Sequence, residues 1–568
     1  MASGSHRFEP GDEIIIVGLM GAGHLNGEHG VVRPIEEWPG REGRVAVQVL
    51  TKPPQTLAVK AQNIQPRPPA CFICLEGDVD QALLQPGCGC RGSSGSVHEH
   101  CAIQAAAAQQ ASAGTWTGKH PWQLCAVCRL PYTGPLKLAL AQEWCRRTEP
   151  LAATDTQRFA ARTTLGNALS ALGRLGEAET VVRANLETCT VVHGGEHRHT
   201  LGTTLNLGLL LDGQGKHAEA AGVYSDLVET QTRVLGAEHR DTLATAMQLA
   251  GAALNQGRAA EAEERYRAIL EVQARVLGPA DPATLTCGMN YGSALLNLAR
   301  YAEAEATYRA NLDAKRRKLG PEHIDTLMAE MNLGLVYKER GRYADAEECL
   351  AENLAVKRRV LGPSHADTCF AALNLVSVWI DGEMEARYDE AARTVVHAQV
   401  ALRRALGEEH PSVLSAAMHH ALVMHAQGAT PLAVEKLRGV HAAQERVHGK
   451  RDHPDVLETG WRLGAMLGVA EPPAGDAPAA AALLHTVAEY HSAQLGGSHP
   501  RTLRTLVSRG EALMATGDDE DASEAARVLA ECEVSQRAVL EPSHPDLLKC
   551  RRLLERTRQR PAVAVDVL

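Results

Sequence analysis

Apolar and polar positions repeat with a fixed period over most of the chain. From residue 155 onward, stretches with the apolar spacing of helices alternate with short turns that mostly contain glycine. Helix pairs that recur at a constant period stack on their neighbours to bury their apolar faces. The pattern therefore predicts an α-solenoid over residues 155–560, with about nine helix pairs and an end helix near 546–560, followed by a tail at 561–568. Four turns, LGAEHRDT, LGPADPAT, LGPEHIDT and LGPSHADT, end 42 residues apart, at Thr242, Thr284, Thr326 and Thr368.

Small residues recur at the same step inside the predicted helix pairs. Side-chain size at a contact sets how closely two helices approach each other. A row of alanines near the start of the second helices therefore predicts where the two helices of each pair cross closely. The row consists of Ala220, Ala262, Ala304 and Ala346.

The first 69 residues alternate apolar and polar positions as strands do. HGVVRPI, GRVAVQVL and TLAVKAQNI are separated by turns rich in Gly and Pro. We predict a small β-barrel over residues 1–69, similar to SH3- and KOW-like barrels, joined to the next domain by the Pro-rich stretch 65–70. The segment GLMGAGHL lacks the Lys and the Ser or Thr of a phosphate-binding loop, so no nucleotide site is expected there.

The charge balance and the apolar runs limit the classes of function. The chain has 58 Lys+Arg against 68 Asp+Glu, a net charge of −10. Because affinity for nucleic acid depends on neutralising phosphates, we expect no nucleic-acid partner.

No apolar run reaches the roughly 18 residues of a membrane helix. Asp12 and Glu13 stand where a signal peptide has Lys or Arg. We therefore expect no membrane insertion and an intracellular, cytoplasmic location.

Seven of the fourteen cysteines fall between residues 71 and 128, in pairs with the spacing of metal ligands. Such a cluster without a secretory signal favours metal ligation over disulfides. A structural zinc ion takes four Cys or His ligands in a tetrahedron, so eight ligands predict two Zn²⁺ ions in a finger over residues 70–132. The pairs are Cys71-x2-Cys74, Cys88-x-Cys90, His98-x2-Cys101 and Cys125-x2-Cys128.

The order and spacing of these pairs, and the segment PGCGCRGSSGSVHEHC, resemble the RING-CH finger of ubiquitin-protein ligases. In that family His98, and not the neighbouring His100, has the expected two-residue gap before Cys101. PHD fingers, which bind histone tails, use the same ligand order with a wider second pair and a shorter gap before the histidine, so a histone-tail reader is an alternative. The resemblance implies a cross-brace in which Cys71, Cys74, His98 and Cys101 hold one zinc ion and Cys88, Cys90, Cys125 and Cys128 hold the other.

The same resemblance implies an activity without a covalent intermediate. RING fingers bind a ubiquitin-conjugating enzyme charged with ubiquitin and order its thioester for attack by a substrate lysine. The increase in transfer rate comes from positioning the reactants. By resemblance, Ile73 is an apolar contact to that enzyme and Arg129 is the cation that bridges enzyme and ubiquitin. Ile73 could equally fill the small core, and Arg129 could be an ordinary surface charge. The tryptophan usual in the family is Ala105 here, and Trp122 either replaces it as a contact or packs the finger.

The 42-residue repeats resemble tetratricopeptide repeats in the form found in kinesin light chains. In such proteins, asparagines on the first helices face the concave groove and hold the backbone of an extended peptide, because an amide both donates and accepts hydrogen bonds. The same step relates five amides here, which we predict to bind a protein client. The alternative is hydrogen bonding between adjacent helices. The five are Asn206, Gln248, Asn290, Asn332 and Asn374.

Histidines also recur, in the turns between repeats. Neighbouring histidines of this row are a full repeat apart, roughly 10 Å, which is too far to share one metal ion. We therefore predict that they cap helices and pack the turns. The row consists of His197, His239, His323, His365, His410, His453, His499 and His544.

Together these features predict a multidomain, mainly α protein with a small N-terminal β-barrel, a two-zinc finger, a connecting helix over residues 133–154 and the solenoid. The predicted function is that of a RING-CH-type ubiquitin-protein ligase, with a ubiquitin-conjugating enzyme and ubiquitin as partners of the finger and a protein client in the solenoid groove. The alternative is a zinc-binding interaction adaptor that resembles kinesin light chain and has no ligase activity.

Overall fold

The computed structural model falls into two compact units, Met1–Thr203 and Thr204–Leu568, and each is described by itself. The description covers residues 13–16, 29–33, 44–49, 55–60, 64–66, 71, 73–74, 83–84, 97–112, 121–125, 128–470 and 475–559.

Unit 1 begins with an antiparallel sheet. Its five strands follow the order β4-β3-β2-β1-β5. The predicted strands are therefore present, but the predicted barrel is not supported, because no pairing between the edge strands β4 and β5 is found among the described residues. The strands are β1 (Glu13–Ile16), β2 (His29–Arg33), β3 (Arg44–Val49), β4 (Gln55–Lys60) and β5 (Ile64–Pro66).

The finger segment of unit 1 combines a two-stranded sheet with helices. Strands β6 (Leu83–Leu84) and β7 (Val97–His98) pair antiparallel, and α1 (Glu99–Ser112) follows β7 directly. Helix α2 (Gly134–Thr148) then packs on α1 and on α3 (Thr156–Ala171). One apolar cluster joins these elements to the finger, because Trp122, Leu136, Leu140, Trp144 and Ala161 are buried together.

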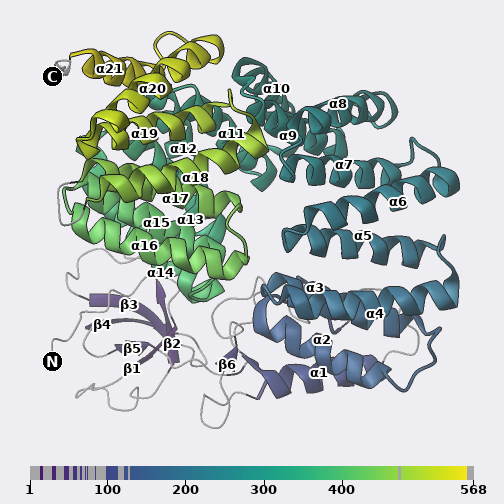
Figure 1. The fold of residues 1–568 in the computed structure, drawn as a ribbon. Coiled ribbons are helices and arrows are strands. Elements are labelled where there is room, and N and C mark those ends of the chain that lie inside the picture. Colours follow the sequence, from purple (N-terminus) through teal and green to yellow (C-terminus); the bar gives the residue numbers. More distant parts are fainter. Residues whose placement is uncertain are drawn as a thin grey trace, which may run out of the picture. The chain divides into compact units, whose positions relative to one another are not determined.

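Helices occupy nearly all of the described chain from residue 156 onward (Figure 1). Nine successive antiparallel pairs, α3–α4 to α19–α20, are followed by α21, and α5 crosses the boundary between the units. The predicted repeating helical solenoid is thus confirmed. The remaining helices are α4 (Leu175–His193), α5 (Arg198–Gly213), α6 (His217–Leu235), α7 (Arg240–Asn255), α8 (Ala259–Val276), α9 (Pro282–Asn297), α10 (Tyr301–Leu319), α11 (Ile324–Glu339), α12 (Tyr343–Leu361), α13 (Ala366–Asp381), the 3-10 turn η5 (Glu385–Arg387), α14 (Tyr388–Leu406), α15 (Pro411–Ala426), α16 (Thr430–His448), α17 (Pro454–Val469), α18 (Ala477–Leu495), α19 (Pro500–Thr516), α20 (Asp519–Val539) and α21 (Pro545–Gln559).

Close packing within the pairs follows from the small residues. The alanine row is fully buried, as Ala262 and Ala304 illustrate. Opposite such alanines, glycine makes room for an aromatic ring: a Cβ added to Gly292 would lie 2.8 Å from the ring of Tyr308. The side chains on either side of these contacts form continuous apolar cores along the solenoid.

The recurrent histidines of unit 2 cap helices, as the sequence predicts. Nδ1 of His323 accepts the backbone N–H of Asp325 at 3.2 Å, and Oγ1 of Thr326 donates to the carbonyl of Gly320 at 2.8 Å. These bonds satisfy backbone groups that a helix end leaves without partners. Caps of the same geometry begin α7, α13, α15, α17 and α19.

Repeats far apart in sequence meet within unit 2. Nζ of Lys450 donates to the carbonyl of Gly215 at 3.3 Å, and His544 lies 3.1 Å from the carbonyl of Glu339. The helix pairs therefore turn back on themselves and enclose space between repeats. None of the described helices combines the length and the apolar character that crossing a bilayer would require.

Candidate functional site

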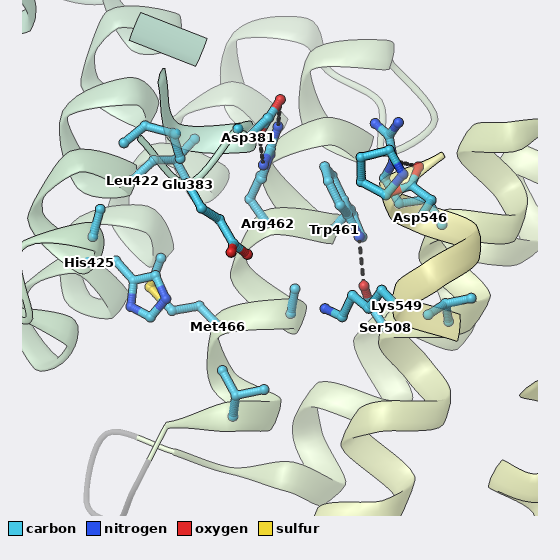
Figure 2. A pocket seen from close by; sticks show the side chains of 18 of the residues that line it. Asp381, Glu383, Leu422, His425, Trp461, Arg462, Met466, Ser508, Asp546 and Lys549 are labelled. Carbon is cyan, nitrogen blue, oxygen red and sulfur yellow. Dashed lines mark hydrogen bonds and ion pairs between the residues drawn. The ribbon is translucent and has the colours of Figure 1, made fainter. Parts of the chain in front are cut away.

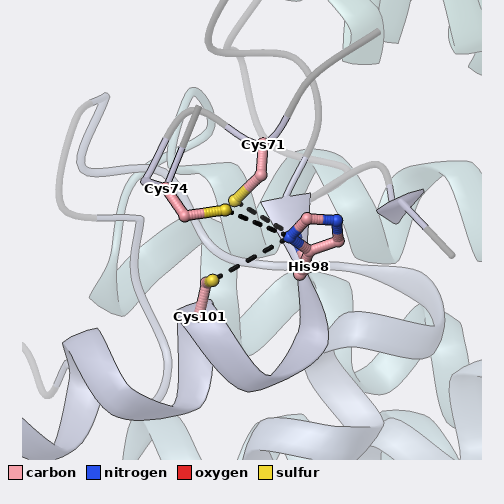
Figure 3. A group of neighbouring side chains, drawn as sticks. All are labelled: Cys71, Cys74, His98 and Cys101. Carbon is pink, nitrogen blue, oxygen red and sulfur yellow. Dashed lines mark hydrogen bonds between the residues drawn. The ribbon is translucent and has the colours of Figure 1, made fainter. Parts of the chain in front are cut away.

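Four of the predicted zinc ligands converge in the finger. Cys74 lies in a turn, His98 ends β7, and Cys101 lies in the first turn of α1. Nδ1 of His98 is 3.3 Å from Sγ of Cys74 and 3.9 Å from Sγ of Cys101. Together with Cys71, the four donor atoms lie within 4.8 Å of one another (Figure 3).

This donor set fits a structural zinc ion. Bonds of about 2.0 to 2.3 Å place tetrahedral ligands roughly 3.3 to 3.8 Å apart, close to the distances found here. The structure also distinguishes the two histidines: Nε2 of His100 lies 3.2 Å from Sγ of Cys101, but His100 does not belong to the converging group. The assignment of His98 over His100 thus agrees with the geometry.

The protein groups alone shift the pKa values of Cys71 and Cys101 in opposite directions. Burial acts to raise the pKa of Cys71, but backbone hydrogen bonds from Cys74, His98 and Ile73 outweigh it and lower the pKa to about 7. Burial and the neighbouring sulfurs raise the pKa of Cys101 to about 12. A divalent cation would stabilise all the thiolates at once, with release of the remaining protons.

Only half of the second predicted zinc set lies among the described residues. Cys88 and Cys90 lie outside them. The N–H of Cys125 donates to the carbonyl of Leu130 at 2.9 Å, and the N–H of Arg129 donates to the carbonyl of Cys125 at 2.9 Å. Cys125 and Cys128 are thus held on one tight turn, as a pair of ligands for a single ion requires.

The three predicted contacts to a conjugating enzyme differ in exposure. Ile73 is 41% exposed, and Arg129 is also exposed, in a left-handed conformation with φ of 61°. Trp122 is fully buried, and its Nε1 donates to Oε1 of Gln110 at 2.8 Å. Trp122 therefore packs the finger and is wrong as a surface contact. The sequence analysis missed Leu130, which is 50% exposed beside Arg129.

The five predicted groove amides share one environment. All are on the first helices of their pairs, α5, α7, α9, α11 and α13, and all are half-buried. Among the residues that the structure describes, none of the five side chains has a hydrogen-bond partner. The alternative of hydrogen bonding between adjacent helices finds no support in these contacts.

A cavity of about 700 Å³ lies within unit 2, at the ends of the first helices of later repeats (Figure 2). Trp461 and Met466 of α17 line it, and Nε1 of Trp461 donates to Oγ of Ser508 at 3.0 Å. The guanidinium of Arg462 lies 4.2 Å from the centroid of the Trp461 ring. Cavities of this size accommodate small ligands or a few side chains of a peptide.

Paired charges form one wall of this cavity. Arg462 donates two hydrogen bonds to Asp381, at 2.7 and 3.2 Å, and Lys338 lies 3.0 Å from the same carboxylate. Arg504 bonds Asp546 at 2.8 Å. Burial acts to raise the pKa of Asp381, but Arg462 and Lys338 outweigh it and hold the pKa far below its usual range.

The sequence indicates only part of this wall. Glu339 and Asp381 are 42 residues apart, and each is the last residue of the first helix of its pair. Arg462 and Arg504 lie at different positions inside α17 and α19, where the helix spacing departs from the 42-residue step. The pairing of the carboxylates with the arginines depends on how the solenoid turns, and the period does not contain that information.

Two family models match segments of the chain. A RING-variant domain matches residues 71–128, and tetratricopeptide repeats match residues 157–233, 241–308, 285–352 and 325–378. No curated protein is a significant match.

Solved structures with similar helical repeats include TPR-like repeats assigned to a kinesin light chain of Podosopora anserina, at 22% identity and a TM-score of 0.33, covering 36% of this chain and 96% of that one. BtubC from P. vanneervenii has 20% identity and a TM-score of 0.34, covering 40% and 91%. A Rap protein complexed with Competence and Sporulation Factor has 13% identity and a TM-score of 0.42, covering 70% and 93%.

Proposed function

We propose that this protein is a RING-CH-type ubiquitin-protein ligase whose finger binds a charged ubiquitin-conjugating enzyme and whose solenoid binds a protein client. The observation that carries the proposal is the convergence of Cys71, Cys74, His98 and Cys101 within the segment that matches a RING-variant domain. The second zinc ion would lie on Cys88, Cys90, Cys125 and Cys128.

In the proposed reaction the finger positions the reactants and forms no bond itself. A client lysine attacks the thioester carbonyl of ubiquitin, an amide bond forms, and the thiol of the conjugating enzyme leaves. Two exposed apolar side chains support a docking surface on the finger: Ile73 adjoins the first ligand pair, and Leu130 follows the last ligand by two residues. Binding the client on the same chain raises the local concentration of its lysines.

Reconstituted ubiquitination tests the finger. With a panel of conjugating enzymes, wild type is expected to form ubiquitin chains, and Ile73→Ala and Arg129→Ala to reduce the rate by about 10-fold or more, as loss of an interface hot spot does. Val191→Ala is the matched control, because Val191 is 81% exposed on α4, outside the finger. Equal rates in all four proteins, or no activity with any enzyme, would contradict the proposal.

A peptide-binding measurement tests the groove. Peptides selected from a random library on the wild-type protein are expected to bind the double variant Asn290→Ala, Asn332→Ala about 10-fold or more weakly, because two amides that would hold the peptide backbone are lost. Autoubiquitination should be unchanged. The double Gln variant should retain most of the affinity, since Gln248 occupies this row naturally. Full affinity in the double Ala variant would show that the peptides do not bind at this row of amides.

One observation favours the second candidate, an adaptor without ligase activity. Ala105 stands where the family usually has a tryptophan that faces the conjugating enzyme, and it lies half-buried on α1. The buried Trp122 does not replace that contact. An adaptor would retain zinc and peptide binding while showing no ubiquitin transfer.

A further inference from the structure

Three ligands of metal-binding type converge in unit 2, outside the finger. His448, His453 and Asp455 each offer one donor atom, and these atoms lie within 4.8 Å of one another. Within the described part of the chain, the finger set is the other group with this property. We propose that His448, His453 and Asp455 form a binding site for a divalent transition-metal ion such as Zn²⁺ or Co²⁺.

The group arises from a local departure from the repeat. His448 ends α16 where most other repeats have a leucine, such as Leu235 or Leu361. The turn that follows is also one residue longer, since His453 comes five positions after His448, whereas His239 comes four after Leu235.

The extra residue changes the backbone of the turn. Gly449 has a left-handed conformation with φ 67° and ψ 10°. The corresponding Gly236 has φ 98° and ψ 154°. The longer turn thus brings a new histidine beside the capping histidine His453 and beside Asp455, in the first turn of α17.

A ring nitrogen of His448 faces a carboxylate. Its Nε2 is buried and lies 3.3 Å from Oδ2 of Asp455, without the alignment of a hydrogen bond. The rings of His448 and His453 are stacked, with centroids 3.5 Å apart and planes 10° apart. A buried polar atom without a well-aligned hydrogen bond is costly. A metal ion could take both this nitrogen and the adjacent carboxylate as ligands.

A second place in the chain shows that the histidine alone is not enough. His193 also occupies the leucine position, and His197 follows it at the ordinary four-residue distance. Their rings are stacked at 4.4 Å, with His199 nearby. These three histidines do not form a group of donor atoms within 4.8 Å. Convergence is thus found where the histidine, the longer turn and Asp455 occur together.

The donor set matches the chemistry of such an ion. Imidazole and carboxylate ligands suit zinc, cobalt and nickel, and three protein ligands leave at least one position for water. Tetrahedral ligands lie roughly 3.3 Å apart, and the two stacked rings would have to rotate so that both nitrogens point at one ion. Lys450 is a nearby positive charge that would repel a cation, and its ammonium is held at the carbonyl of Gly215. An ion here would fix the turn that carries this contact between distant repeats.

Isothermal titration of the full-length, zinc-loaded protein with Co²⁺ tests the site. Wild type is expected to bind one equivalent of Co²⁺ beyond the zinc already held by the finger. His448→Leu should lose that equivalent without unfolding, because leucine is the usual residue at this position. Asp455→Asn, which keeps the side-chain shape, should weaken binding by at least about 10-fold. His193→Leu is the matched control and should bind like wild type.

The two leucine variants decide whether the ion binds at His448. Loss of the equivalent in His448→Leu but not in His193→Leu supports the site. Equal binding by His448→Leu and wild type, or no binding by wild type, overturns the proposal. The test is independent of the ligase proposal, since no ubiquitin transfer is measured.

Discussion

Removal of zinc is expected to unfold the finger and leave most of the solenoid helices folded. Cys71 and Cys101 are buried in the same small cluster as Val97, Trp122 and Tyr132. A core of this size supplies little stability by itself. Structural zinc contributes about 10 kcal/mol or more to the folding of zinc-finger peptides. With the ion gone, the bonds that hold the four ligand side chains together are lost, and the cluster should open.

Tryptophan fluorescence and circular dichroism measure this effect. Trp122 and Trp144 are buried in the cluster, so a strong chelator should shift the emission to longer wavelength while most of the helical signal remains. Cys101→Ser should behave like the chelated protein. Cys145→Ser is the matched control, because Cys145 packs against the same cluster without being a predicted ligand. Unchanged emission after complete zinc removal would contradict a structural role of the ion.

Replacement of Arg462 by alanine is expected to destabilise unit 2 by about 3 kcal/mol, the lower end of the range for breaking a buried ion pair. The change leaves Asp381 with Lys338 as its remaining cation, in a wall where the Asp381 side chain is 12% exposed. Lys338 compensates in part, which is why the lower end applies. The midpoint of urea unfolding, followed by the helical signal, measures the effect.

An exposed pair provides the control for this substitution. Arg527 is 61% exposed and lies 3.0 Å from Glu531, and such surface pairs contribute about 1 kcal/mol or less. Arg527→Ala should therefore shift the midpoint only slightly. A shift for Arg462→Ala no larger than that of the control would show that the cavity wall does not depend on its ion pairs.

The pH dependence of stability follows from the same charges. Arg462, Arg501 and Lys338 outweigh burial and lower the pKa of Glu458, as Arg462 and Lys338 do for Asp381. Carboxylates with lowered folded-state pKa values stabilise the fold above their unfolded pKa of about 4. Wild type should lose this contribution as the pH falls below about 4 toward the folded-state values. Arg462→Ala should lose less over the same range.

The sequence predicts the solenoid well because its information is local and repeated. Each helix pair carries the same alanine at its crossing point and the same kind of cap at its start, so one interpretation applies many times. His323 and Thr326 form the cap and turn that their positions suggest. Four finger ligands were also predictable, because zinc restricts both the residue types and their spacing.

Other features depend on contacts that the spacing does not specify. Asp381 ends α13 and Arg462 lies in the middle of α17, so their pairing depends on the path of the solenoid over 81 residues. Trp122 is buried because α2 supplies Leu136 and Leu140, which lie outside the finger motif. The proposed site at His448 does not follow from the repeat period, because its ligands come from one lengthened turn.

Zinc content of the purified, reduced protein tests whether the finger holds two ions. The measurement is best made in the His448→Leu background, so that a metal ion at the second site does not add to the count. Two equivalents are expected, retained in Cys145→Ser and lost in Cys101→Ser, whose finger should not fold. Fewer than two equivalents in the background protein, or two that survive Cys101→Ser, would contradict this expectation.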